Sequence, residues 1–97
     1  MNLRFVHEAS SELVGAIAYY EAIEYGLGVR LKEQVRTVLT WIAENPELPR
    51  LRAAGHRRVN LRVFPYYLAY AIWEEEIWIL AVAHSARRSE YWIDRAP

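Results

Sequence analysis

The spacing of apolar residues changes once along this 97-residue chain, and the change limits the folds that it can adopt. Up to residue 42, apolar residues recur at steps of three and four, which is the spacing of a helix with one buried face. From residue 57 onward they alternate with polar residues or form short unbroken runs, which is typical of strands. We therefore expect an α+β fold in which two helices precede most of the sheet.

Two predicted helices make up most of the first half of the chain. The first apolar stripe consists of Ala9, Leu13, Ala16, Ile17, Tyr20 and Ile23. It stops at Gly26–Leu27–Gly28, because glycine is the usual residue just past a helix end. The second stripe consists of Leu31, Val35, Val38, Leu39 and Ile42. It stops at Asn45–Pro46, because the residue before a proline avoids the helical region. Since the link between the helices is very short, they should form an antiparallel hairpin.

Four strands are expected around this hairpin. Residues 3–6 form a short first strand. From residue 57 to 63, Val59, Leu61 and Val63 alternate with Arg58, Asn60 and Arg62, as in a half-buried strand with a cationic outer face. Residues 67–73 and 77–83 are apolar on both sides, which is typical of central strands. Glu74–Glu76 connects these two strands, and because it contains no glycine we expect a loose loop there.

The expected order is therefore β-α-α-β-β-β, in a single domain that spans residues 1–97. The antiparallel helix hairpin is the only candidate to cover one face of the mostly antiparallel sheet. The opposite face, which carries Arg58, Arg62, Tyr67 and Trp73, is expected to be open and to hold the functional site.

Composition argues against several kinds of site. Cysteine is absent, so the chain can form no disulfide and no cysteine-based zinc site. His7, His56 and His84 lack the spacing of metal ligands, and there is no glycine-rich phosphate loop, so we expect neither metal nor cofactor. No apolar run reaches the ~20 residues that cross a bilayer, and no leader pattern opens the chain. We therefore expect a cytoplasmic protein without membrane contact.

Charge is unevenly distributed although the net charge is zero. Residues 50–62 contain five arginines and His56 but no acid, and Lys32 is the only lysine of the chain. Arginine is suited to bidentate recognition of phosphate or carboxylate. The alternative is a solvated strand edge with no partner.

A second group of polar and aromatic residues follows directly on the last apolar strand. It consists of His84, Arg87, Arg88, Tyr91, Trp92 and Arg95. Such a combination suits a polyanion, a catalytic site or a protein partner. Each member also has a structural alternative: His84 could bond a backbone carbonyl, the arginines could pair with nearby acids, and Trp92 could pack the tail onto the core.

Motifs in a fixed order extend over nearly the whole chain. They are Ala9…Glu12–Leu13, Tyr19–Tyr20–Glu21, Gly26–Leu27–Gly28, Ile42…Asn45–Pro46, Arg57–Arg58…Leu61…Phe64–Pro65–Tyr66…Leu68…Tyr70 and Ile79-to-His84…Arg87–Arg88…Tyr91–Trp92…Arg95. In these motifs the chain resembles the RelE/ParE superfamily of toxins from bacterial type II toxin–antitoxin systems, once known as plasmid stabilisation proteins. The resemblance implies the β-α-α-β-β-β fold and a growth-inhibiting protein that a cognate antitoxin neutralises.

The resemblance leaves two targets open. One branch of the superfamily cleaves mRNA on the ribosome, and the other acts on DNA gyrase without established catalytic chemistry. The strong ribonucleases are basic and use lysines on the sheet, whereas this chain is neutral and has no lysine after Lys32. A ParE-like, gyrase-directed toxin is therefore the favoured interpretation, and a RelE-like, metal-independent mRNA endonuclease is the alternative.

Each target has its own candidate residues. For target binding these are Arg58, Arg62, Arg87, Arg88 and Trp92. For the ribonuclease they are His84 for proton transfer, Arg87 for the phosphate and Tyr91 for stacking on a base. The aromatic content of so small a domain also allows a homodimer.

Overall fold

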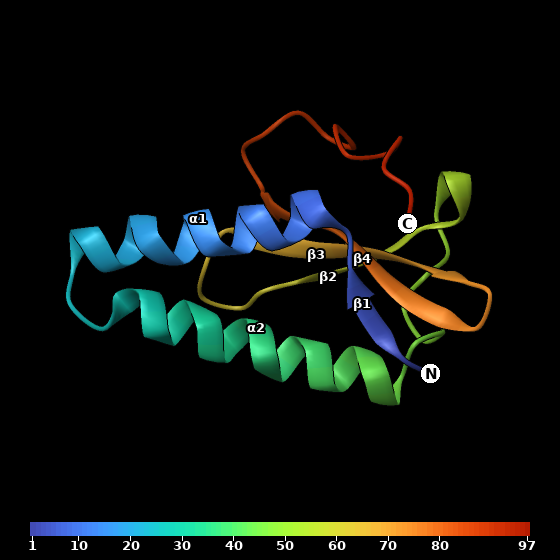
Figure 1. Ribbon diagram of the computed structural model, residues 1–97, viewed down its shortest axis with the longest axis horizontal. Coiled ribbons are helices and arrows are strands. Elements are labelled where there is room, and N and C mark those ends of the chain that lie inside the picture. Colours follow the sequence, from blue (N-terminus) through green and yellow to red (C-terminus); the bar gives the residue numbers. More distant parts are fainter.

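The computed structural model describes residues 1–97 as a helix hairpin packed against a four-stranded sheet (Figure 1). The elements are β1 (Leu3–Phe5), α1 (His7–Ile23), α2 (Leu27–Glu44), the short 3₁₀ helix η1 (Ala53–Gly55), β2 (Arg57–Asn60), β3 (Tyr66–Trp73) and β4 (Glu76–His84). This confirms the predicted order β-α-α-β-β-β. None of the helices is both long and apolar enough to span a bilayer.

The sheet has the strand order β1-β4-β3-β2 and is mostly antiparallel, as predicted. Only β1 runs parallel to its neighbour, with Leu3 opposite Ile77 on β4. The register between β3 and β4 shifts after Ala69, which leaves Leu80 without an opposite residue. This irregularity bends the two central strands and turns Leu80 toward the face that does not contact the helices.

A carboxylate holds the tight turn between α1 and α2. Gly26 adopts a left-handed conformation with φ 87°, which glycine tolerates without strain. The two oxygens of Glu21 accept hydrogen bonds from the backbone amides of Gly26 and Gly28, at 2.8 and 2.9 Å. At Gly28 a Cβ would lie 2.5 Å from the carbonyl oxygen of Ile17, so the close approach of the helices requires glycine.

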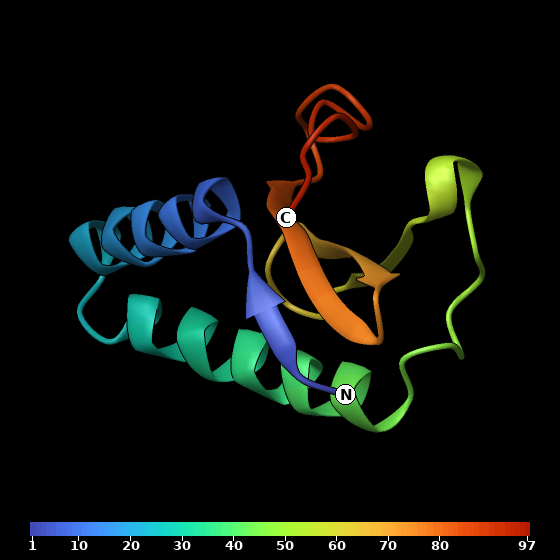
Figure 2. The ribbon, with the colours of Figure 1, turned by 45° about the vertical axis from the view of Figure 1, so that its right-hand side comes forward.

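The hydrophobic core lies between the hairpin and one face of the sheet (Figure 2). Leu31, Val35 and Ile42 of α2 are buried, as the helical stripe predicts. Tyr70 of β3 is also buried, and its hydroxyl donates to the carbonyl oxygen of Pro46 at 2.7 Å, just past the end of α2. The hairpin therefore covers one face of the sheet, as expected.

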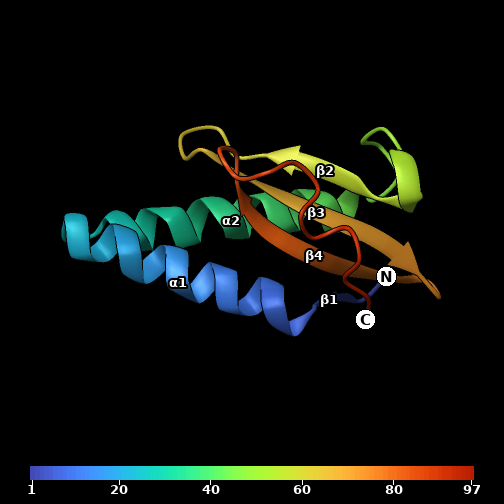
Figure 3. The same ribbon diagram turned by 90° about the horizontal axis from the view of Figure 1, so that it is seen from above.

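The expectation of an open opposite face is wrong, because the C-terminal tail (residues 85–97) crosses it (Figure 3). By register, Tyr67, Ala69, Ala81 and Ala83 lie on this face. Three alanines leave room for a large side chain, and Trp92 of the tail is fully buried there. Its indole nitrogen donates to the Tyr67 hydroxyl at 2.9 Å.

Two local predictions are also corrected. The strand predicted over residues 57–63 ends at Asn60, because Leu61 donates back to the carbonyl of Tyr66 at 2.9 Å and closes a turn. Val63, expected to point inward, is therefore 68% exposed. The loose loop predicted at residues 74–76 is a two-residue turn in which Glu74 and Glu75 adopt φ angles of 50° and 63°. Two glutamates thus occupy left-handed positions that usually take glycine or asparagine.

Candidate functional site

The carboxylate of Glu12 on α1 anchors the tail. It accepts two hydrogen bonds from the Arg95 guanidinium, at 2.8 and 3.1 Å. The hydroxyl of Tyr91 donates to the same carboxylate, and so does the backbone amide of Val82 at 3.1 Å. Arg95 also donates to the carbonyl of Leu80 at 3.0 Å. One acid thus connects α1, β4 and the tail.

This arrangement fixes the protonation of both tail residues. Burial raises the pKa of the Tyr91 hydroxyl, and the hydrogen bond to the Glu12 carboxylate raises it further. The same carboxylate raises the pKa of Arg95. The Tyr91 hydroxyl therefore stays protonated over the whole physiological pH range, so it can donate a hydrogen bond but cannot act as a base.

A second contact holds the tail at Trp92. The edge of the buried His56 ring packs against the indole, with 4.6 Å between ring centroids and 84° between planes. His56 Nε2 lies 3.4 Å from a carboxylate oxygen of Glu90, which is close enough for an ion pair but not in the geometry of a hydrogen bond. Neither ring nitrogen has a hydrogen-bond partner, so packing rather than polar contact holds this histidine.

The three residues predicted for ribonuclease chemistry lie around one pocket of about 200 Å³ between α1 and the tail. His84 Nδ1 accepts a hydrogen bond from the backbone amide of Ala86 at 3.0 Å, whereas in the structural alternative the ring would donate to a backbone carbonyl. This leaves Nε2 of the neutral ring as the N–H nitrogen. The Arg87 guanidinium stacks 3.8 Å above the Tyr91 ring and lies 3.8 Å from a Glu12 oxygen.

The arginines predicted for target binding occupy different environments. Arg62 and Arg88 are exposed and form no ion pair, whereas Arg58 stacks 3.6 Å above the Tyr67 ring. The amide of Ser85 donates to the carbonyl of Pro65 at 2.8 Å, so the turn after β2 and the start of the tail lie at the same end of the sheet. Arg62 and the pair Arg87–Arg88 therefore flank one end of the sheet.

Trp92 does not fit its predicted role. Its side chain is fully buried, so a target cannot reach it, and the alternative of packing the tail onto the core is correct. Sequence reasoning also missed Glu12 as the anchor of the tail. The available signal was its position within the buried helical stripe that contains Ala9 and Leu13, where an acid needs a partner.

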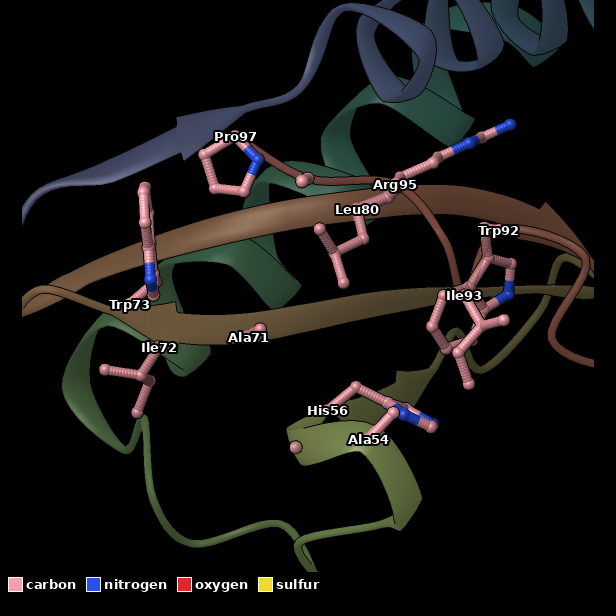
Figure 4. A pocket seen from close by; sticks show the side chains of 12 residues that line it. Ala54, His56, Ala71, Ile72, Trp73, Leu80, Trp92, Ile93, Arg95 and Pro97 are labelled. Carbon is pink, nitrogen blue, oxygen red and sulfur yellow. The ribbon is translucent and has the colours of Figure 1, made fainter.

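A larger pocket of about 450 Å³ opens between the tail and η1 (Figure 4). Its lining includes Trp73, Leu80 and Ile93 and is mostly apolar. His56 and Arg95 also border it, but Arg95 is held by Glu12. This pocket suits an apolar side chain of a partner better than a reaction.

Comparison with known proteins gives a family match and a structural match for this architecture. A family model described as "ParE toxin of type II toxin-antitoxin system, parDE" matches residues 3–89. A solved structure titled "Chromosomal ParDE TA system from P. aeruginosa" superposes with a TM-score of 0.65, and 87% of this chain and 95% of that chain are covered at 19% identity. At this identity the structural match shows a shared fold. No curated protein matches the sequence.

Proposed function

The chain belongs to the ParE toxin family of type II toxin–antitoxin systems, and on that premise we propose that it inhibits bacterial growth by binding DNA gyrase. In this proposal residues 1–97 act in the cytoplasm as a single toxin domain. A toxin of this class has an antitoxin as its partner. The question that the site must answer is whether the target is a protein or an RNA strand.

The main support for a protein target is that several aromatic rings near the site are already covered by other side chains of the protein or are buried. Recognition of single-stranded RNA commonly stacks a splayed base on an aromatic ring. Arg87 covers one face of Tyr91, Arg58 covers Tyr67, and Trp92 is buried. Tyr91, the ring expected to stack on a base, is thus engaged within the protein together with Tyr67 and Trp92, which supports a protein target.

Arginines at the end of the sheet are the proposed contacts with gyrase. Arg62 and Arg88 carry free guanidinium groups, which can form bidentate pairs with carboxylates of a protein partner. Stacking on Tyr67 and Tyr91 orients Arg58 and Arg87, so less side-chain entropy is lost when they bind.

The second candidate function is metal-independent cleavage of mRNA. It is favoured by one observation, namely that His84, Arg87 and Tyr91 share a pocket. The Nε2–H group of His84 makes no hydrogen bond within the protein and could donate one to an oxygen of the scissile phosphate. In that case Arg87 would neutralise the phosphate and Tyr91 would donate a proton or a hydrogen bond.

The antitoxin is proposed to cover the outer surface of the hairpin and the neighbouring sheet edge. Large apolar side chains are exposed on α1, α2 and their turn, which is unusual for a chain that remains alone in water. They are Val14, Tyr19, Ile23, Tyr25 and Val29. A second copy of the chain is the other occupant of this surface, and the mass of the purified toxin in solution distinguishes the two.

Gyrase supercoiling and transcript integrity, followed in parallel, test the proposal. The wild-type toxin should block supercoiling and leave transcripts intact. Replacing Arg62 and Arg88 with alanine should weaken the block at least about tenfold, which corresponds to 1.4 kcal/mol of lost binding. The control variant Arg30→Ala/Arg36→Ala loses the same charge from exposed positions on α2 and should remain active. Cleaved transcripts with normal supercoiling, abolished by His84→Ala, would establish the alternative instead.

A further inference from the structure

Five arginines on and beside β2 are not used by the tail or by the pocket around His84, and we propose that they bind the phosphate backbone of duplex DNA. This arginine edge consists of Arg50, Arg52, Arg57, Arg58 and Arg62. It adds a nucleic-acid partner to the protein target proposed above, and Arg58 and Arg62 are shared between the two proposals. β2 is an edge strand, so the surface beside it is free of other strands.

Hydrogen bonds hold the loop arginines next to the strand. Arg57 Nε donates to the carbonyl of Pro49 at 3.0 Å, which places Arg50 beside the first residue of β2. The amide of Arg52 donates to the carbonyl of His56 at 2.7 Å, immediately before that strand. Arg58 lies on β2, and Arg62 follows in the turn after the strand ends at Asn60. The loop arginines therefore lie beside the start of β2, and Arg57 and Arg58 project to opposite sides of that strand.

None of the five arginines of this edge is paired with an acid. Elsewhere in the chain, Arg4, Arg87 and Arg95 each pair with a glutamate, whereas no member of the arginine edge forms an ion pair. Arg58 instead bonds the neutral side chain of Asn60 and stacks on Tyr67. Five like charges kept together without acids repel one another, and a polyanion relieves that repulsion.

The residue types favour a duplex over a single strand. Single-stranded nucleic acids are bound through aromatic rings on which bases stack, together with positive charge. Residues 45–62 contain no phenylalanine, tyrosine or tryptophan, and Arg58 covers the neighbouring Tyr67 ring. Planar guanidinium groups without stacking rings match phosphate oxygens on the outside of a duplex, whose bases are already stacked.

The uneven charge distribution orients the protein as it approaches DNA. Because the net charge of the chain is zero, the residues outside 50–62 carry a negative charge equal to that of the arginine edge. A polyanion is therefore attracted more strongly to this edge than to the remainder of the molecule, whose net charge is negative. The field orients the protein without making it strongly basic.

Binding of the purified chain to a short fluorescent duplex, measured by anisotropy over a range of salt, tests the proposal. Each phosphate contact contributes about −0.9 to the slope of log K against log salt concentration. Replacing Arg50 and Arg52 with alanine should flatten the slope by about 2 and leave the melting temperature equal or higher, since repulsion is removed. The matched control Arg30→Ala/Arg36→Ala should retain the wild-type slope.

The proposal fails if the duplex does not bind at low salt, if the slope is unchanged in Arg50→Ala/Arg52→Ala, or if the control flattens it equally. Tighter binding of a single-stranded RNA of the same length would also overturn it. Gyrase is absent from this measurement, so its outcome is separate from that of the target proposal.

Discussion

Tyr91 donates a hydrogen bond to the carboxylate of Glu12, which lies 79 positions earlier in the chain. The contact joins the C-terminal tail to the first helix, and Arg95 completes it with a bidentate ion pair. The tail is therefore a structural layer of the molecule as well as the carrier of its exposed arginines.

Replacing Glu12 with glutamine should destabilise the protein strongly. The substitution keeps the shape of the side chain but leaves Arg95, which is only 18% exposed, without its counter-charge. We expect a loss of roughly 3 kcal/mol in the free energy of unfolding. Urea unfolding measures it, and Glu33→Gln at an exposed position of α2 serves as control. A loss below about 0.5 kcal/mol would show that Glu12 does not anchor the tail.

Stability should fall in alkaline solution because of Tyr91. Its pKa is raised in the folded protein, so the native state retains a proton that the unfolded chain releases above pH ~10. The stabilisation that the protonated Tyr91 hydroxyl gives to the folded state is thus complete below that pH and is lost as the pH rises further. Tyr91→Phe should flatten the decline, measured by denaturant unfolding at several alkaline pH values. An equally steep decline in this variant would assign the effect to Tyr66 or Tyr70, whose pKa values are also raised.

Two glycines of the hairpin should respond in opposite directions to alanine. At Gly28 the new methyl group meets the backbone of Ile17 at 2.5 Å, and we expect a loss of about 2 kcal/mol. At Gly15 in α1 nothing lies within 4 Å, and we expect a gain of about 0.5–1 kcal/mol from helix propensity. Thermal unfolding of both variants makes the comparison. Equal effects would mean that the helices can separate at Gly28 without cost.

The β3–β4 turn should be improved by residues that tolerate left-handed conformations. Replacing Glu74 with asparagine and Glu75 with glycine relieves two positive φ angles, and we expect a gain of about 1 kcal/mol. Glu75→Ala removes the charge without relieving the backbone and is the control. If the control stabilises as much as the double variant, repulsion between the glutamates is the cause and not strain.

The fold could be predicted because its elements are defined by local patterns. The helical stripe through Leu31 and Ile42 and the apolar runs of the central strands indicate which side of each element is buried. Proline and glycine then mark the ends of the helices. No longer-range information was needed to reach the order β-α-α-β-β-β.

The candidate site was harder to predict because its contacts join distant parts of the chain. The residues next to Trp92 in the sequence do not show that alanines on β3 and β4 leave space for an indole. The burial of Trp92 over the sheet could therefore not be predicted from the sequence. Likewise, the partner of Glu12 lies at the far end of the sequence. His84, Arg87 and Tyr91 were expected together because they follow one strand end closely, and they do line one pocket.

The parallel pairing of β1 with β4 has a consequence for refolding. Leu3 and Ile77 lie 74 positions apart in the sequence, and their contact closes a loop that contains the whole helix hairpin. Loop closure of this length slows folding, whereas the hairpin forms from neighbours in sequence. We therefore expect stopped-flow refolding in which early helical signal precedes sheet formation, with the N-terminal strand docking last.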